Sequence, residues 1–225
     1  MIYQFKITLK DINPPIWRSA LIDPTMTMEE LHYVTQSLMG WECEHLYQFS
    51  SGKRRIVAPE DEGEEGDEFA SDVLIGQAFR KLEDKWTYIY DFGDNWEHEI
   101  TLEKIVELEN GVEYPACVDG ARACPPEDCG GPLGYQNLLL VLKNPSDPEH
   151  KDLIEWLGDD FDPEEFDKNE INFELHDPEN WVEEDEDLDF TRVVGDDEED
   201  DDEEDDDDDD DEDDNDDEDD NDDED

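Results

Sequence analysis

The sequence is short of positive charge. Its 225 residues include 15 lysines and arginines against 75 aspartates and glutamates, which gives a formal net charge of −60 at pH 7. Because so negative a surface is repelled by the phosphate backbone of nucleic acids, we expect no direct nucleic-acid binding. Basic proteins, polycations and divalent cations are the partners that this charge attracts.

Long apolar runs and a secretory signal are also missing. No stretch approaches the ~20 apolar residues that a membrane-spanning helix needs. The first residues, MIYQFKITLK, lack the basic region and apolar segment of a signal peptide. Without a signal, the four cysteines argue against a disulfide scaffold. These absences predict a cytoplasmic protein that is not membrane-bound.

The acidic charge is concentrated at one end of the chain. Residues 196–225 hold 28 of the 75 acidic residues and no basic one. Such a segment has no apolar surface to offset its ordering entropy, so we expect a disordered polyacidic tail over 181–225 and a folded domain over 1–180. The tail either keeps the protein soluble or attracts a basic protein partner, and the sequence leaves both open.

The first third of the chain predicts two strands, a helix and a third strand. Thr27 and Glu30 form a capping box at the start of the helix, and Gly40 suits its end. Alternating apolar residues place the strands at 2–10, 16–22 and 45–51. This order is typical of a β-grasp-like half-domain.

The rest of the folded part predicts a central hairpin and a helical C-terminal region. An acidic loop spans 58–71 and a strand spans 100–108. Helices are expected at 72–83, 134–144, 147–158 and 162–170, and a last strand at 171–175. In the helix over 147–158, Asp147 is the expected N-cap and Gly158 the expected end. The overall prediction is an α+β fold with a mixed or antiparallel sheet.

The stretch YDFGDNWEHEI, residues 90–100, carries five ionisable groups in a predicted hairpin. Alternation places Glu97 and Glu99 on the solvent face and His98 on the apolar face. His98 is either a core histidine with one hydrogen-bond partner or a ligand or proton-transfer group.

The length of the hairpin turn decides what faces His98. A three-residue loop, Gly93–Asn95, pairs Tyr90 with His98 and is the favoured register, with Gly93 at positive φ and Asp94 capping the turn. A two-residue turn instead places Asp91 opposite His98, which would give a carboxylate–imidazole pair.

Three cysteines lie in a loop rich in proline and glycine. Cys117, Cys124 and Cys129 are separated by six and four residues, which is not the paired spacing of common zinc motifs. Thiolates nevertheless suit Zn²⁺, and His98 as a fourth ligand would complete a structural Cys₃His site. Cys43 and His45 are alternative fourth ligands. Free thiols packed as small apolar groups are the other interpretation.

The sequence PPED, residues 125–128, joins two rigid residues to two carboxylates. Glu127 and Asp128 are expected to accept backbone N–H groups of the following GGPLG segment. Alternatively, they bind a hard cation together with Asp91 or Asp94.

Three motifs in this order, YDFGDNWEHEI, CPPEDCGGPLGY and IEWLGDDFDPEEFD, give the chain a resemblance to the plasmid pRiA4b ORF-3-like family over about residues 1–180. GWECEHLYQF and IWR fit it as well. The resemblance implies a small cytoplasmic α+β domain, and some members are passenger proteins of insertion elements with a TnpR label. This chain has neither a serine-nucleophile setting nor a basic DNA-binding arm. The resemblance marks recurring positions at His45, Asp91, Gly93, Asp94, Trp96, His98, Pro125, Pro126, Glu127, Asp128, Gly130 and Gly131.

Three functions follow from these patterns. The first, which the sequence favours, is a binding or regulatory module whose folded body binds a protein partner and whose acidic tail attracts basic surfaces. The second is a metal-dependent hydrolase that uses Zn²⁺ or another ion to activate water. The third is a structural zinc site with no chemistry. The hydrolase would draw its site from the hairpin and the PPED loop: Asp91, Asp94, His98, Glu127 and Asp128.

Overall fold

The computed structural model describes residues 1–158 and 161–176, all within one compact unit, Met1–Val193. The predicted tail, residues 181–225, lies outside the described residues. The strands are β1 (Ile2–Leu9), β2 (Ile16–Ile22), β3 (Tyr47–Ser51), β4 (Arg54–Val57), β5 (Glu68–Phe69), β6 (Lys85–Tyr90), β7 (Trp96–Val106) and β8 (Ala116–Ala121). The helices are α1 (Met28–Met39), the 3₁₀ turn η1 (Ala70–Asp72), α2 (Ile75–Ala78), α3 (Gly131–Leu142), α4 (His150–Leu157) and α5 (Lys168–Leu175).

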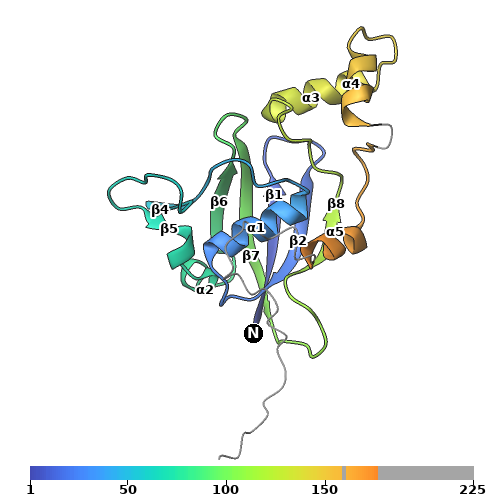
Figure 1. Ribbon diagram of the computed structural model, residues 1–225. Coiled ribbons are helices and arrows are strands. Elements are labelled where there is room, and N and C mark those ends of the chain that lie inside the picture. The colour runs from blue at the N-terminus through green and yellow to red at the C-terminus, as the bar shows by residue number, and fades with distance from the viewer. Residues whose placement is uncertain (159–160, 177–225) are drawn as a thin grey trace, which may run out of the picture. The chain divides into compact units, whose positions relative to one another are not determined.

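The strands form one sheet in the order β5-β4-β3-β6-β7-β1-β2-β8 (Figure 1). Every neighbouring pair is antiparallel except β4 and β5. The predicted α+β class is therefore confirmed. The β-β-α-β order predicted for the first third of the chain is confirmed, and in the sheet the hairpin β6–β7 lies between β3 and β1. Alternation fixes which face of a strand is buried, but it does not fix the neighbour that the strand joins.

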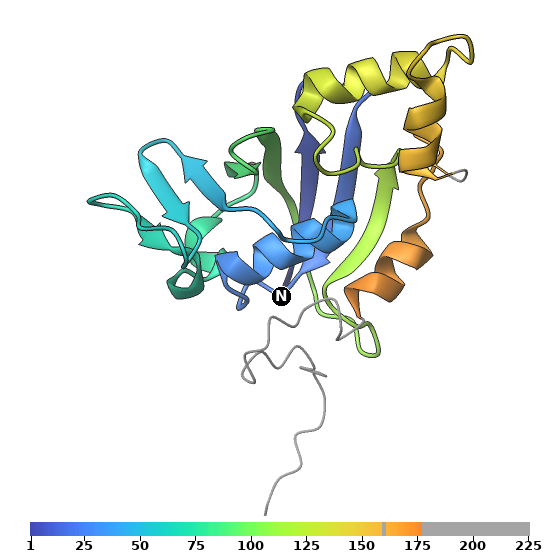
Figure 2. The same ribbon diagram turned by 45° about the horizontal axis from the view of Figure 1, so that its top comes forward.

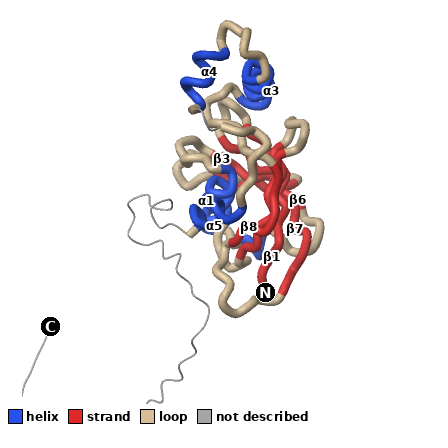
Figure 3. Tube along the Cα trace, turned by 90° about the vertical axis from the view of Figure 1, so that its right-hand side faces the viewer, coloured by secondary structure: helices blue, strands red, loops and turns tan. Residues whose placement is uncertain are grey.

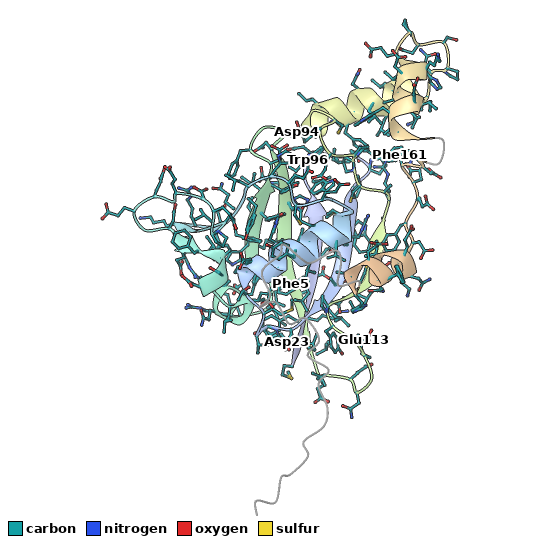
Figure 4. All side chains as sticks on the ribbon, in the orientation of Figure 1. Phe5, Asp23, Asp94, Trp96, Glu113 and Phe161 are labelled. Atoms are coloured by element: carbon teal, nitrogen blue, oxygen red, sulfur yellow. The ribbon has the colours of Figure 1, made fainter. Side chains whose placement is uncertain are left out.

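Helices α1 and α5 lie on the same face of the sheet (Figure 3). The capping box of Thr27 and Glu30 is present, and Gly40 ends α1 in a left-handed conformation, as predicted. Phe5 is fully buried in the core between α1 and the sheet (Figure 4). No helix in the described part of the chain is long and apolar enough to span a membrane.

The C-terminal elements differ from the prediction. Residues 162–167 form no helix, because the Asp162 side chain and carbonyl accept N–H groups from the next residues and close a turn. Asp167 then caps α5 by accepting the N–H groups of Asn169 and Glu170. The strand expected at 171–175 is therefore helical, and it directs Leu175 into the core.

Two further helix predictions need adjustment. The helix expected at 72–83 is reduced to η1 and the four residues of α2. The helix expected at 147–158 begins at His150, because the carboxylate of Asp147 accepts the N–H of Glu149 and forms a turn ahead of the helix. Helices α3 and α4 stand together at one end of the sheet, beyond the β6–β7 turn (Figure 2).

Candidate metal centre

The β6–β7 hairpin is the first part of the site. Tyr88 pairs with His98 and Tyr90 with Trp96, so the loop is the five residues Asp91–Asn95. Both predicted turns were too short. The longer loop forms because Asp91 and Asn95 adopt left-handed conformations, with φ of 54° and 55°. The N–H of Asn95 donates to the Asp91 carbonyl at 2.6 Å.

Side-chain roles in this loop also differ from the prediction. Asp91, not Asp94, caps the turn, since its Oδ1 accepts the Gly93 N–H at 2.8 Å. Gly93 is not at positive φ. The Asp94 carboxylate instead accepts the N–H of Gly130 at 3.0 Å. Asp94 thereby ties the hairpin to the start of α3, and Figure 4 shows it at that end of the sheet.

The register differs from the favoured prediction by two residues, and a shift of two keeps every side chain on its predicted face. Glu97 and Glu99 therefore lie on the outer face, where they form ion pairs with Lys10 at 2.6 Å and Lys85 at 2.7 Å. His98 is fully buried on the apolar face, as expected.

His98 has the surroundings of a core histidine. Its ring lies 5.2 Å from that of Tyr88 and 5.4 Å from that of Trp41, measured between centroids. Nδ1 is 3.1 Å from the Trp96 carbonyl, and Nε2 has no hydrogen-bond partner among the described residues. Burial lowers the pKa of His98 to about 4, so the ring is neutral at pH 7.

The structure does not bring the three cysteines and His98 together. Cys117 lies on β8, where its backbone pairs with the side chain of Asn172. Cys124 packs against Met39 and Arg18, and Cys129 precedes α3. Burial raises the pKa of Cys117 and Cys124 to about 11 and that of Cys129 to about 12, which favours the protonated thiols over thiolates.

The PPED loop is the second part of the site. Glu127 accepts a hydrogen bond from the Tyr90 hydroxyl at 2.6 Å and from the Glu42 N–H at 2.9 Å. It therefore joins three segments, and neither of its oxygens bonds the GGPLG backbone as predicted. Burial and the Glu127 carboxylate raise the pKa of Tyr90, which keeps its hydroxyl protonated and donating.

The third part is the loop that precedes β3, which carries His45. Its Nε2 lies 3.5 Å from an Asp128 carboxylate oxygen. One ligand atom from each of His45, Asp91 and Asp128 lies within 4.8 Å of the other two, and no other such group occurs in the residues that the structure describes. Side-chain exposure of 31 % for His45 and 72 % for Asp128 leaves the group open to solvent.

This group matches one sequence hypothesis in part. The alternative in which a PPED carboxylate joins Asp91 agrees with the geometry, although one Asp91 oxygen also accepts the Gly93 N–H. Asp94 and Glu127 lie outside the group and bond other parts of the protein. His45 takes the position that the hypothesis gave to His98. The alternation of apolar and polar residues predicted that His98 is buried, but it did not connect His45 with the hairpin. In the sequence, His45 was indicated by the positions that recur in the family that the chain resembles.

A family model, a related protein and a solved structure match the chain. The model of the plasmid pRiA4b ORF-3-like proteins matches residues 1–170. Uncharacterized protein y4hQ of Sinorhizobium fredii (strain NBRC 101917 / NGR234) is 35% identical over 158 residues, covering 70% of this chain and 81% of that protein. The crystal structure of MM3350, a protein of unknown function from Methanosarcina mazei Go1, is 38% identical with a TM-score of 0.68, covering 75% of this chain and 96% of that one. The chain is a member of the plasmid pRiA4b ORF-3-like protein family.

Proposed function

We propose that the domain binds one divalent metal ion through His45, Asp91 and Asp128 and uses it to hydrolyse a small substrate. The observation that carries the proposal is the convergence of one imidazole and two carboxylates, all with ligand atoms within 4.8 Å of one another. Three otherwise separate loops supply them, so their meeting depends on the whole fold.

The backbone of the two acidic ligands supports this proposal. Asp91 and Asp128 both hold left-handed conformations, with φ of 54° and 56°. Aspartate tolerates this region better than most residues do, but the conformation still costs free energy. Such costs are commonly found at functional sites, where the surrounding structure enforces the geometry.

The ligand set suggests both the ion and the chemistry. Imidazole and carboxylate ligands suit Mn²⁺ and Zn²⁺. Three protein ligands leave coordination positions free for water and substrate, which is the arrangement of catalytic rather than structural sites. A bound ion would supply an activated water at neutral pH. Glu127 is a positioning residue in this account, because it connects the Asp128 loop to Tyr90 and to the loop of His45.

Metal titration tests the proposal. We expect the full-length protein to bind Mn²⁺ or Zn²⁺ at one saturable site by calorimetry, and Asp91→Asn and His45→Ala each to weaken that site at least tenfold. His176→Ala is the matched control, since His176 also lies near a carboxylate, Glu113 at 3.9 Å. It should bind metal like the wild type. Equal affinity in the His45 and His176 variants would reject the site.

Hydrolysis is tested separately with p-nitrophenyl acetate and p-nitrophenyl phosphate as probes. We expect metal-dependent release of nitrophenol from one of them, and loss of that activity in Asp128→Asn. Saturable metal binding with no turnover of either ester would retain the metal site and reject the hydrolase assignment for these two ester classes.

The Tyr90–Glu127 hydrogen bond gives a further prediction. Tyr90→Phe removes the donor from a 2.6 Å bond to a carboxylate. We expect the free energy of unfolding to fall by about 1–2 kcal/mol in urea denaturation. The affinity for Mn²⁺ should also fall, because the loop of Asp128 loses a support. Tyr114→Phe, which removes an exposed hydroxyl that accepts the Glu109 N–H, is the control. Equal effects of the two changes would contradict the positioning role.

A second candidate function rests on the charge of the chain. We also propose that the acidic tail recruits a basic protein, because residues 196–225 contain 28 acidic residues and no basic one. Pull-downs at low salt with full-length protein and a variant ending at residue 195 distinguish the two ideas. A basic protein recovered only by the full-length chain supports recruitment, and equal recovery by both forms rejects it.

A further inference from the structure

One cavity in the described part of the chain is lined by none of the three proposed metal ligands. It has a volume of about 660 Å³ and lies between the C-terminal end of α1, the loop after it and the segment that leads into α5. Helices α1 and α5 lie side by side there (Figure 1). This volume falls within the range of sites for small organic ligands.

The wall of this cavity is strongly negative. Five acidic residues line it, and only one basic residue does. Glu42, Glu165 and Glu170 form no ion pair with any residue that the structure describes. The five acidic residues are Glu42, Glu165, Asp167, Glu170 and Glu174.

The one basic residue, Arg18, is buried, and its guanidinium donates hydrogen bonds to groups of the protein. It is 3% exposed. Its Nε donates to the Leu38 carbonyl at the end of α1 at 2.9 Å, and Nη1 donates to the carbonyls of Trp17 and Ala121. The helix end and these carbonyls offset its charge. Arg18 therefore leaves the negative field at the cavity mouth largely unopposed.

Aromatic side chains form part of the wall, beside aliphatic and small residues. Tyr33, Trp41 and Phe166 all line the cavity. The guanidinium of Arg18 lies 5.1 Å from the centre of the Phe166 ring, so a cation is already held against an aromatic face here. Aromatic faces attract ammonium groups and also bury apolar groups, so the wall suits a ligand with both.

We propose that this cavity binds a small organic amine with an apolar body. The ammonium group would sit at the acidic mouth near Glu165 and Glu170, and the apolar part would pack on Trp41 and Phe166. The acidic side chains favour a cation as the ligand. The aromatic side chains favour an organic cation over a metal ion. The inference does not depend on the metal site, with which the cavity shares no ligand.

The test uses 2-phenylethylamine as the probe and the full-length protein. We expect saturable binding by calorimetry, with a change in tryptophan fluorescence, and at least tenfold weaker binding of phenylacetate and of methylamine. Phenylacetate has the ring without the positive charge, and methylamine has the charge without the ring. Equal binding of methylamine would mean simple counterion attraction to the acidic chain and would overturn the proposal.

Variants locate the site. Glu165→Gln/Glu170→Gln should weaken 2-phenylethylamine binding at least tenfold. Glu149→Gln/Asp152→Asn is the matched control, because it removes the same charge from a second cavity of about 470 Å³ between α3 and α4. The control should bind like the wild type. Equal loss in both variants, or binding of lysine-rich peptides without binding of the amine, would overturn the assignment.

Discussion

The domain is expected to lose about 3 kcal/mol of unfolding free energy through His98 alone when the pH falls from 7 to 4. Burial lowers the pKa of His98 to about 4 in the folded state, against about 6.5 for an exposed histidine. Between these values the unfolded chain binds the proton more readily. The stability is therefore fully present above pH 6.5 and is lost as the pH falls towards 4. His32, with its pKa lowered to about 3 by burial, adds to the loss in the same direction.

Urea denaturation at several pH values, with wild type and His98→Phe, measures this effect. Phenylalanine suits the aromatic surroundings and cannot titrate. Acid also neutralises carboxylates and relieves repulsion in a chain of charge −60, but it does so in both proteins. The difference between the two pH profiles isolates His98. Parallel profiles between pH 6.5 and 4 would show that the imidazole is not buried as described.

Gly131→Ala is expected to destabilise the domain by about 3 kcal/mol and to weaken metal binding. Gly131 begins α3 with φ of 67°, and a Cβ there would lie 2.3 Å from the backbone carbonyl oxygen of Asp94. Backbone cannot move aside as a flexible side chain can. The hairpin and the PPED loop would have to separate, which moves Asp91 away from Asp128.

Gly111→Ala is the control for Gly131→Ala, because it adds a side chain at positive φ without a steric clash. Gly111 also has positive φ, 81°, but a Cβ there meets no atom within 4 Å. It should lose about 1 kcal/mol and keep its metal affinity. Thermal unfolding and metal titration of both variants provide the comparison. Equal losses in the two would show that close contact between the hairpin and α3 is not required.

Local sequence signals predicted the features that depend on local chemistry. The capping box at Thr27 and the left-handed end at Gly40 follow from short-range hydrogen bonds and glycine's conformational freedom. The burial of His98 follows from the alternation of side chains along the strand. That prediction therefore remained correct although the predicted register was wrong by two residues. The place of β3 was missed because no local signal tells a strand which neighbour to join.

The sequence indicated some residues of the proposed metal site and missed others. Asp91 and Asp128 were predicted as candidate ligands because they lie in turn-forming segments rich in carboxylates. The three cysteines suggested zinc because thiols are distinctive metal ligands, yet they form no metal-ligand group in the described part of the chain. His45 could not be linked to Asp128 from the sequence, because only the tertiary fold brings together positions 83 residues apart.

Diffraction from crystals of the full-length protein soaked in MnCl₂ tests whether His45, Asp91 and Asp128 bind a metal ion. We expect one anomalous peak about 2.0–2.6 Å from His45 Nε2 and from carboxylate oxygens of Asp91 and Asp128, absent from crystals of Asp91→Asn. A peak at another group of side chains, or none beside an ordered His45, would contradict it.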